Sequence, residues 1–370
     1  MEEKFFEEGN VKINRYFGKI SKKLPVFYNP LMKLNRDISI LILDYFIRNY
    51  KKNLKICLPL SGSGIRGIRF LKLFQNNISL IKFNDKNPLA VENIEENLEL
   101  NGISISEKSS KDKITVTKLN ANLCMNQNKW DYIEIDPFGS PVLFIDNAII
   151  NIKNNSILSV TATDTAALCG TYPNKSLRRY FIKTKKTDFY DELGLRNLIS
   201  FCVREGFKYD KALIPILSYS QNHYYKVFFL VKKSITEVKK LINKLKYLDV
   251  TEDKEIIIKN YLNESNIGPT YIGELNNKEV LKDLNLDLIN DKKAEDLMNK
   301  LIEELDIVGY YNLHKLIGYY KIKKIPKKDK LFSEIKKRDY KVSGTHNSKY
   351  GIKTNMPKKD LIKLIKEMIT

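Results

Sequence analysis

Residues 136–141, Asp-Pro-Phe-Gly-Ser-Pro, carry side chains that could hold and deprotonate an amino group on an aromatic base. The carboxylate of Asp136 can accept hydrogen bonds from such an amine and take a proton from it. Pro137 has no backbone N–H, and its carbonyl is free as a second acceptor. The ring of Phe138 offers a flat apolar surface for stacking a base, worth ~1–3 kcal/mol. The motif therefore favours chemistry on an exocyclic amine.

An exocyclic amine on guanine or adenine is a poor nucleophile, because its lone pair is delocalised into the ring. An enzyme that methylates it must hold the nitrogen in line with the reactive methyl group at about 3 Å. The alternative is an ordinary turn in which Asp136 caps the following helix. The position of the motif directly after the predicted strand Tyr132–Ile135 favours the catalytic interpretation.

A glycine-rich segment at residues 60–67, Leu-Ser-Gly-Ser-Gly-Ile-Arg-Gly, lies between a predicted strand and a predicted helix. Gly62, Gly64 and Gly67 satisfy the Gly-x-Gly-x-x-Gly pattern, in which glycine allows a sharp turn and a close approach to a ligand. Asp85 follows Gly67 by eighteen residues and can accept hydrogen bonds from both ribose hydroxyls of a nucleotide. This pattern fits NAD as well as S-adenosylmethionine. The motif at residues 136–141 is suited to amine methylation and favours S-adenosylmethionine.

Short apolar runs that alternate with helical patterns must position these residues. The chain predicts helices over Ile65–Phe74 and Pro88–Leu100, and strands over Lys55–Pro59, Leu80–Asn84, Ile114–Lys118, Tyr132–Ile135, Ser156–Val160, Ala212–Leu217 and Tyr224–Val231. The last two strands are close enough to form an antiparallel hairpin. The fold class is therefore α/β, a Rossmann-like seven-stranded methyltransferase domain followed by a smaller α+β C-terminal domain. Parallel strands would bring their carboxyl ends to one edge of the sheet.

The character of the chain changes after residue 232. We expect a methyltransferase domain over residues 1–232, with an N-terminal extension over 1–35, and a basic C-terminal domain suited to nucleic acid over 233–370. The segment Ile235–Tyr247 reads as a basic amphipathic helix, and Asp249–Leu305 as helical and charged.

The net charge favours a polyanionic partner. The 370 residues include 64 Lys and Arg against 44 Asp and Glu, a formal net charge of +20. A solvated lysine-rich surface is the alternative. Basic residues concentrate between Lys321 and Lys341, near Tyr319, Tyr320 and Tyr340, a mixture suited to phosphate contacts and stacking. The candidates for RNA binding in this segment are Lys323, Lys324, Lys327, Lys328, Lys336, Lys337 and Arg338.

No secretory signal and no apolar run long enough to span a membrane is visible, so we expect a soluble cytoplasmic protein without membrane contact. The cysteines are scattered and form no Cys-x-x-Cys pair, which favours buried free thiols; they are Cys57, Cys124, Cys169 and Cys202. No metal is expected.

Taken in order along the chain, the motifs resemble those of the tRNA guanine-26 N2-dimethyltransferases of archaea and eukaryotes. The segments that carry the resemblance are Glu8-Gly9, residues 25–30 (Pro-Val-Phe-Tyr-Asn-Pro), Asn35-Arg36-Asp37, residues 61–66, Asn84-Asp85, residues 136–141, residues 161–164 (Thr-Ala-Thr-Asp), Gly268-Pro269, and the stretch from Thr345-His346 to Lys353-Thr354. The resemblance covers most of the chain. It implies that S-adenosylmethionine is the cofactor, tRNA the partner, and the N2 amine of a guanine the target of a first and then a second methylation.

The resemblance also implies roles in cofactor binding. Arg36 and Arg66 would grip the cofactor through its methionine carboxylate, and Asp85 would hold the ribose. The turn that begins at Asn120 and Ala121 would lie by the adenine. The family usually has Asp-Ala-Asn at this turn, and Asn120 cannot act as a full carboxylate acceptor, so backbone groups of Ala121 would take over.

The resemblance further implies that Phe27 sandwiches the target base against Phe138, whereas the residues alone favour a buried core aromatic at Phe27. It adds His346 and Lys353 to the tRNA-binding set. Many relatives carry paired cysteines in the second domain, but this chain has no cysteine beyond Cys202, which excludes a cysteine-ligated zinc there. Two other functions stay open: an amino-methyltransferase acting on ribosomal RNA or DNA, and a non-enzymatic RNA-binding protein with a relic cofactor fold.

Overall fold

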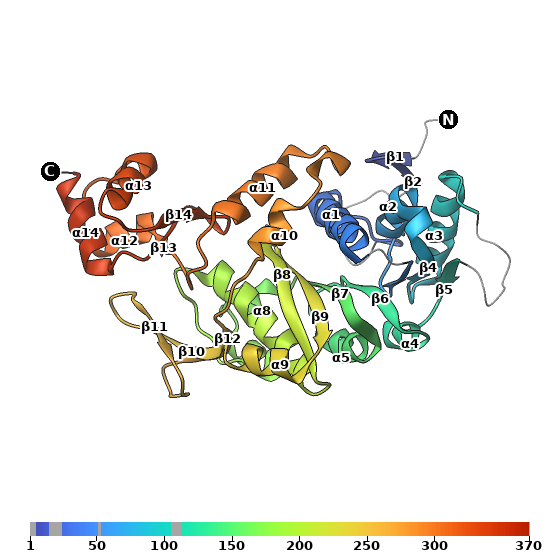
Figure 1. Cartoon of the computed structure of the whole chain (residues 1–370), viewed down its shortest axis with the longest axis horizontal. Helices are drawn as coiled ribbons and strands as arrows, with labels where there is room; N and C mark the ends of the chain where they lie inside the picture. The colour runs from blue at the N-terminus through green and yellow to red at the C-terminus, as the bar shows by residue number, and fades with distance from the viewer. Residues whose placement is uncertain (1–4, 15–23, 51–52, 105–112, 370) are drawn as a thin grey trace.

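The computed structural model describes residues 5–14, 24–50, 53–104 and 113–369. Figure 1 shows a wide body built on one large sheet and a smaller C-terminal part at one end of the molecule. Four sheets are formed by the described residues, of two, three, three and seven strands.

The seven-stranded sheet has the order β5-β4-β3-β6-β7-β9-β8. Its strands are β3 (Leu54–Leu58), β4 (Ile78–Asn84), β5 (Ile114–Thr117), β6 (Trp130–Ile135), β7 (Ile152–Ala162), β8 (Lys211–Gln221) and β9 (Tyr224–Lys233). The first five are parallel, and β9 pairs antiparallel with both β7 and β8. The predicted seven strands with an antiparallel hairpin at the end are confirmed.

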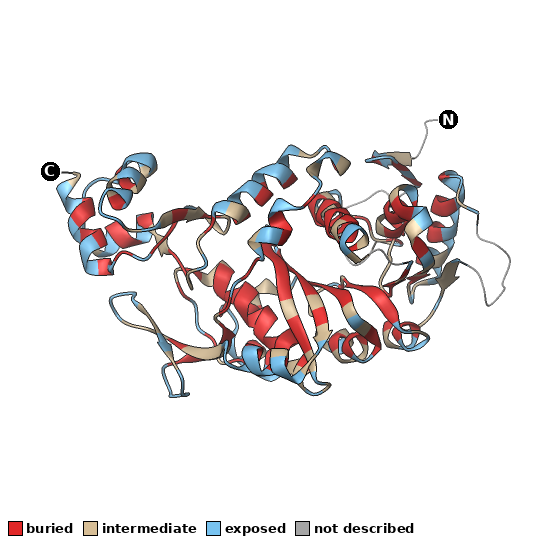
Figure 2. Ribbon diagram, viewed as in Figure 1, coloured by how far each residue is buried: buried red, intermediate tan, exposed pale blue. Residues whose placement is uncertain are grey.

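Helices cover both faces of this sheet, because successive side chains of a buried strand point to opposite sides. Ile56 and Tyr132 belong to one apolar cluster, whereas their neighbours Cys57 and Ile133 belong to the other. The first cluster is closed by α1 (Lys33–Tyr50), α2 (Ile65–Phe74), α3 (Pro88–Leu100), α10 (Lys278–Lys282) and α11 (Lys292–Glu303). The second is closed by α4 (Ala121–Asn126), α5 (Val142–Asn151), α6 (Thr165–Leu168), α7 (Pro173–Tyr180), α8 (Tyr190–Phe207) and α9 (Ile235–Ile242). Figure 2 shows the strands as largely buried between these layers.

The N-terminal hairpin lies on the helices of the first cluster. Strands β1 (Phe5–Glu8) and β2 (Val11–Asn14) pair antiparallel, and η1 (Pro30–Met32) leads into α1. Amide side chains of α3 bond the backbone of β2: the Oδ1 of Asn97 accepts from the N–H of Asn14 at 2.6 Å. The hairpin is thus fixed to the sheet domain.

The segment after β9 differs from the prediction. Helix α9 ends at Ile242, five residues before the predicted end, and strands β10 (Leu245–Val250), β11 (Ile256–Lys259) and β12 (Ile267–Tyr271) form a three-stranded antiparallel sheet within the stretch expected to be helical. The β-branched run Ile256–Ile258 favours extended structure, and Leu248 pairs with Ile258 across the ladder. The many charged residues of this segment masked its strand pattern, so the helical prediction for residues 249–305 was wrong where β10, β11 and β12 lie. Helices α10 and α11 do lie within the predicted range.

The remaining chain forms a small α+β unit with its own core. It contains β13 (Tyr311–Asn312), α12 (Leu313–Tyr319), α13 (Lys328–Lys336), β14 (Val342–Thr345), β15 (Ser348–Thr354) and α14 (Lys358–Glu367). The domain boundary at residue 232 stays a prediction. In the structure, α9, α10 and α11 bury side chains in the two clusters of the large sheet, and the separate C-terminal cluster starts at Leu313.

All four cysteines are buried and free, as expected. No helix among the described residues has the length and apolar character needed to cross a membrane. Those residues also contain no group of three or more His, Cys, Asp and Glu side chains arranged for a metal ion.

Candidate active site

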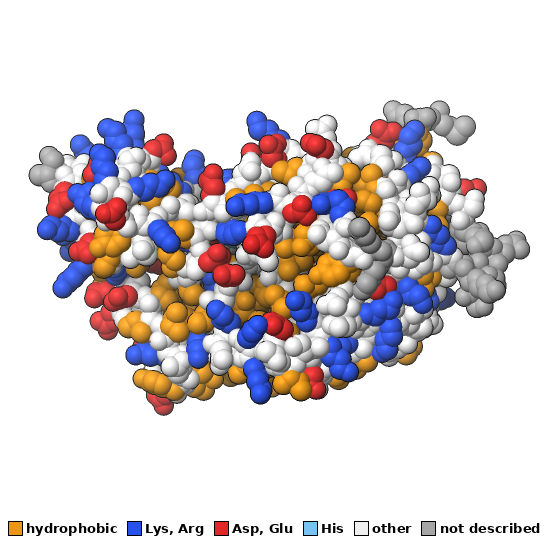
Figure 3. Space-filling model, viewed as in Figure 1, with side chains coloured by type: hydrophobic (Ala, Val, Ile, Leu, Met, Phe, Trp, Pro, Cys, Tyr) orange, Lys and Arg blue, Asp and Glu red, His pale blue; other side chains and the backbone are white. Residues whose placement is uncertain are grey.

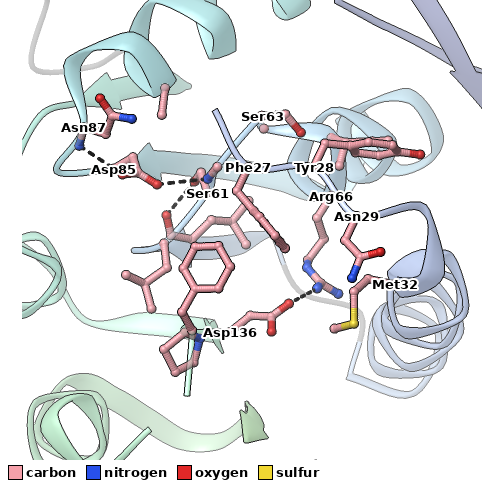
Figure 4. Close-up of a pocket in the computed structure, with 18 of the residues that line it drawn as sticks. Phe27, Tyr28, Asn29, Met32, Ser61, Ser63, Arg66, Asp85, Asn87 and Asp136 are labelled. Carbon is pink, nitrogen blue, oxygen red and sulfur yellow. Dashed lines mark hydrogen bonds and ion pairs between the residues drawn. The ribbon is translucent and has the colours of Figure 1, made fainter. Parts of the chain in front are cut away.

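A cavity of about 530 Å³ opens at the carboxyl ends of β3, β4 and β6 (Figure 4). Its lining comes from the N-terminal segment 24–36, the glycine-rich segment 58–67, the turn after β4, and residues 134–138. The strand order reverses between β3 and β6, and ligands of open α/β sheets bind at such a switch point. The sheet therefore brings three of the predicted motifs to one cavity.

The glycine-rich segment needs its glycines for two different reasons. Gly62 and Gly64 have φ of +54° and +77°, a region that side chains rarely adopt. A Cβ on Gly62 would also lie 3.0 Å from the carbonyl oxygen of Phe27, on the wall of the cavity. At Gly67 a Cβ would lie 2.3 Å from the ring of Phe83, so this glycine lets α2 pack closely against β4.

Asp85 lies on the cavity wall at the end of β4 (Figure 4). Its Oδ2 accepts from the backbone N–H of Gly62 at 3.1 Å, and its Oδ1 accepts from that of Asn87 at 3.0 Å. Asp85 therefore connects the glycine turn to the start of α3, and its half-buried carboxylate faces the cavity.

Arg36 reaches the cavity from α1 and is held by the N-terminal hairpin. Its Nε donates to Glu8 Oε1 at 2.7 Å, and its Nη2 donates to Glu8 Oε2 and to the carbonyl oxygen of Asn29. Burial opposes ionisation of Glu8, but the hydrogen bond and charge of Arg36, with the charge of Arg69, outweigh it and lower the pKa of Glu8. Among the described residues, Nη1 of Arg36 has no hydrogen-bond partner, so it is available to a ligand.

Asp136 stands beyond the tip of β6 and is held by Arg66. Nη2 of Arg66 donates to Asp136 Oδ2 at 2.5 Å (Figure 4). Its Nη1 donates to Ser39 Oγ at 2.6 Å. No other bond to the Asp136 carboxylate is formed by the described part of the chain, so its Oδ1 is free to accept one. Arg66 and Asp136, predicted for separate roles, are thus direct partners.

The sequence analysis missed two buried residues, Glu134 and Lys226, which form an ion pair next to Arg66. Glu134 lies two positions before Asp136 and receives the ammonium of the fully buried Lys226, together with the hydroxyl of Tyr132 at 2.6 Å. Burial alone would raise the pKa of Glu134, but the charges of Arg66 and Lys226 lower it to about 2. Charged residues inside apolar strands were the available signal, since such residues are rarely buried without a partner.

Phe27 and Phe138 contact each other at the cavity mouth. Their ring centroids are 4.2 Å apart with an interplanar angle of 79°, an edge-to-face arrangement. A base sandwiched between two parallel rings needs about 7 Å between them, two stacking contacts of about 3.5 Å each. The two rings therefore have to separate and turn before a base can enter.

The loop after Asp136 is anchored by residues beyond β7. Thr163 lines the cavity and exchanges two bonds with Gly139: its N–H donates to the carbonyl oxygen at 2.9 Å, and its Oγ1 accepts from the N–H at 2.6 Å. The hydroxyl of Tyr180 lies 2.7 Å from Ser140 Oγ and donates to Asp164 at 2.6 Å. Tyr180 was not singled out from the sequence, because nothing local marks a helix residue that reaches a distant loop.

Asn120 and Ala121 do not line the described cavity. The Oδ1 of Asn120 accepts from the N–H of Asn122 at 2.9 Å and caps α4. Their role at an adenine stays a prediction.

The predicted tRNA-binding residues divide into two groups. Figure 3 shows Lys and Arg side chains gathered at the C-terminal end of the molecule. The exposed members of the predicted set there are Lys323, Lys324, Lys327, Lys336, Lys337 and Arg338, and Lys328 is half-buried. Lys337 and Arg338 also contact Glu334.

His346 and Lys353 lie inside the protein instead. His346 Nδ1 is 2.7 Å from Glu304, and its Nε2 accepts from the N–H of Ser220. The ammonium of Lys353 contacts Glu192 at 2.9 Å and Glu304 at 3.2 Å. These two side chains join the C-terminal unit to the sheet domain and have no free surface for RNA in this structure.

Comparison with known proteins gives one consistent result. A family model described as N2,N2-dimethylguanosine tRNA methyltransferase matches residues 5–366. A tRNA (guanine(26)-N(2))-dimethyltransferase of Methanosphaera stadtmanae is 34% identical, with 99% of this chain and 97% of the relative covered. A tRNA (guanine(26)-N(2)/guanine(27)-N(2))-dimethyltransferase of Aquifex aeolicus is 32% identical, covering 94% and 92%. The solved structure of Trm1 from Pyrococcus horikoshii with S-adenosyl-L-methionine is 31% identical over 98% of this chain and 99% of that chain, with a TM-score of 0.87.

Proposed function

This chain belongs to the N2,N2-dimethylguanosine tRNA methyltransferase family, and we infer that it is an S-adenosylmethionine-dependent enzyme that methylates the exocyclic N2 amine of a guanine in tRNA, first once and then a second time. We propose guanine 26 as the target, the position named for the relatives. The observation that carries this function is the free Oδ1 of Asp136 at the wall of the cavity that also contains the glycine turn and Asp85.

The cavity residues fit the cofactor. The backbone at Gly62 leaves no room for a side chain, the buried Oγ of Ser63 has no partner within the described structure, and Nη1 of Arg36 is available. We propose that Arg36 binds the methionine carboxylate, because a guanidinium already fixed by Glu8 loses little freedom on binding. Asp85 accepts the ribose hydroxyls. When bound, S-adenosylmethionine supplies an electrophilic methyl group.

We propose that the target base enters between Phe27 and Phe138 once these rings separate. Stacking on both faces holds the base plane, so that its amine points toward the tip of β6. Asp136 Oδ1 accepts one N–H of the amine, and the carbonyl of Pro137 accepts the other. Orientation by two acceptors turns the nitrogen lone pair away from them.

Asp136 is the proposed proton acceptor in both transfers. The monomethylated amine retains a single N–H, so only one acceptor is needed for the second transfer. Arg66 holds Oδ2 and leaves Oδ1 for the amine. Since its Nη atoms are bonded to Ser39 and Asp136, we assign Arg66 to positioning Asp136 in addition to lining the cofactor cavity.

We propose that the exposed C-terminal lysines bind the phosphates of tRNA, and we leave His346 and Lys353 out of this surface because they are buried. In the proposed division, residues 1–232 perform the transfer and residues 233–370 hold the RNA. Because the substrate is tRNA, we propose that the enzyme acts in the cytoplasm.

The test is to incubate purified protein with S-adenosylmethionine and tRNA, digest the RNA, and locate the modified nucleoside by mass spectrometry. We expect N2-methyl- and N2,N2-dimethylguanosine at position 26. Methylation of ribosomal RNA or DNA with unmodified tRNA would point to the other amine-methylating function. No methyl gain on any nucleic acid, with RNA binding retained, would point to a binding protein.

A further inference from the structure

Exposed basic and aromatic side chains lie on α7 and directly before and after it, outside the cavity lining. Residues 171–187 contain six Lys and Arg and no Asp or Glu. We call the α7 patch the exposed side chains of Tyr172, Leu177, Arg178, Phe181 and Lys186 together with the half-buried Lys175. Phe181 is 68% exposed and Tyr172 58%, an unusual degree for aromatic rings.

The cations of the α7 patch are available to a ligand. Lys175, Arg178 and Lys186 form no ion pair with any residue in the described ranges, whereas Lys183 and Lys185 of the same segment bond backbone carbonyl oxygens of residues 263–265. Unpaired cations and exposed rings within one short segment match a nucleic-acid backbone and its unstacked bases.

The backbone of Phe181 adopts a conformation that is unfavourable for phenylalanine. It caps the C-terminus of α7 with φ of +53° and ψ of +41°, a left-handed position normally taken by Gly or Asn. Among the described non-glycine residues with positive φ it is the one aromatic. Because its ring is mostly exposed, little packing offsets the backbone strain, and such outliers concentrate at functional sites.

The α7 patch is connected to the catalytic loop through the helix itself. The buried face of α7 carries Tyr180, whose hydroxyl contacts Ser140 in the motif that starts at Asp136. Arg178 lies two residues before Tyr180, about 200° around the helix, so it is on the opposite, exposed face, and Phe181 follows Tyr180 at the exposed end of α7. The α7 patch therefore lies on a helix that contacts the loop after Asp136.

We propose that the α7 patch is a second tRNA-binding surface, which holds phosphates and an unstacked base next to the target guanine independently of the C-terminal lysines. This inference rests on the proposed function, since a tRNA substrate gives the surface its occupant. Phosphate contact near the reacting base would fix the register of the target nucleotide.

The proposal is tested by titrating fluorescent tRNA with variant proteins at several salt concentrations. The triple variant Lys175→Gln, Arg178→Gln, Lys186→Gln should make the negative slope of log affinity against log salt shallower by about 2 to 3, which is 0.7–0.9 for each lost phosphate contact. A matched triple variant of exposed lysines elsewhere in residues 1–232, Lys72→Gln, Lys113→Gln and Lys129→Gln, should leave the slope unchanged.

Phe181→Asn separates binding from folding. Asn adopts the left-handed cap readily, so the melting temperature should rise, while tRNA affinity should fall roughly 5- to 150-fold through loss of stacking. If Phe181→Asn lowers the melting temperature instead, its weaker tRNA binding could result from unfolding. The triple variant, which keeps Phe181, then decides the test. If the Lys175, Arg178, Lys186 triple variant and Phe181→Asn both keep wild-type affinity and slope, while the wild-type protein methylates tRNA normally, the proposal is overturned. If the wild-type protein fails to methylate tRNA, the proposed function is wrong instead.

Discussion

Replacing Asp136 by asparagine should lower the rate of methyl transfer by roughly 10²–10⁴-fold, because the amide cannot serve Arg66 and the substrate amine together. In the structure Oδ2 of Asp136 accepts from Arg66 at 2.5 Å, and Oδ1 faces no described donor. If the amide oxygen of the new asparagine accepts from Arg66, its NH₂ group points at the incoming amine, so two donors meet. If the amide is reversed, its NH₂ group meets the guanidinium.

Either orientation removes one hydrogen bond to a charged group, worth about 1.5–3 kcal/mol, or roughly 10- to 150-fold. Loss of the proton acceptor adds to this in the transition state. Affinity for cofactor should change little, since the interaction matters most as the nitrogen gains positive charge.

The assay is single-turnover transfer of a labelled methyl group to tRNA with enzyme in excess, together with calorimetric titration of the cofactor. Asp44→Asn is the matched control, because Asp44 forms a similar ion pair with Arg48 at 2.8 Å on α1, outside the cavity lining. Its transfer rate should equal that of the wild type. A near wild-type rate for Asp136→Asn would show that Asp136 only orients the amine, and a normal rate for Asp136→Ala would refute the catalytic interpretation of the motif.

Further outcomes can be measured on other parts of the structure. Phe27→Ala should raise the KM for tRNA about 5- to 150-fold through lost stacking while cofactor affinity is kept; an unchanged KM would mean that Phe27 lines the cavity without stacking on the base. Asp85→Ala should weaken cofactor binding by ~1–3 kcal/mol in calorimetry, and equal affinity would contradict its role. Glu134 has its pKa lowered from 4.5 to about 2, so its ionisation stabilises the fold above pH 4.5 and this stability is lost as the pH falls toward 2. The stability advantage of the wild type over Glu134→Gln should therefore shrink by about 3 kcal/mol as the pH falls through this window, and an advantage that does not vary with pH would be inconsistent with this. Neutralising Lys323 and Lys324 should flatten the salt dependence of tRNA binding, and a slope equal to that of the wild type would mean a merely solvated face.

The sequence by itself determined the sheet and the position of its motifs. Alternation of apolar runs with helical patterns is local information, and the rule that parallel strands end at one edge then brings the glycine turn, Asp85 and Asp136 together. The glycines could also be interpreted without coordinates, because a required positive φ or a close contact leaves few other residues possible. In the same way, an apolar strand that ends at Asp-Pro predicted a residue at the rim of a site.

Only the tertiary structure decided which charges are partners. Lys353 and Lys323 look alike in a basic C-terminal sequence, yet Lys353 is buried between Glu192 and Glu304, which lie more than a hundred and about fifty positions away in the chain. Arg66 and Asp136 are seventy residues apart, and Lys226 and Glu134 ninety-two. No local pattern encodes such distances, since burial and charge pairing depend on where the rest of the chain packs. For the same reason, strands β10–β12 escaped prediction: their stability comes from pairing across a ladder, which a pattern dominated by charges does not reveal.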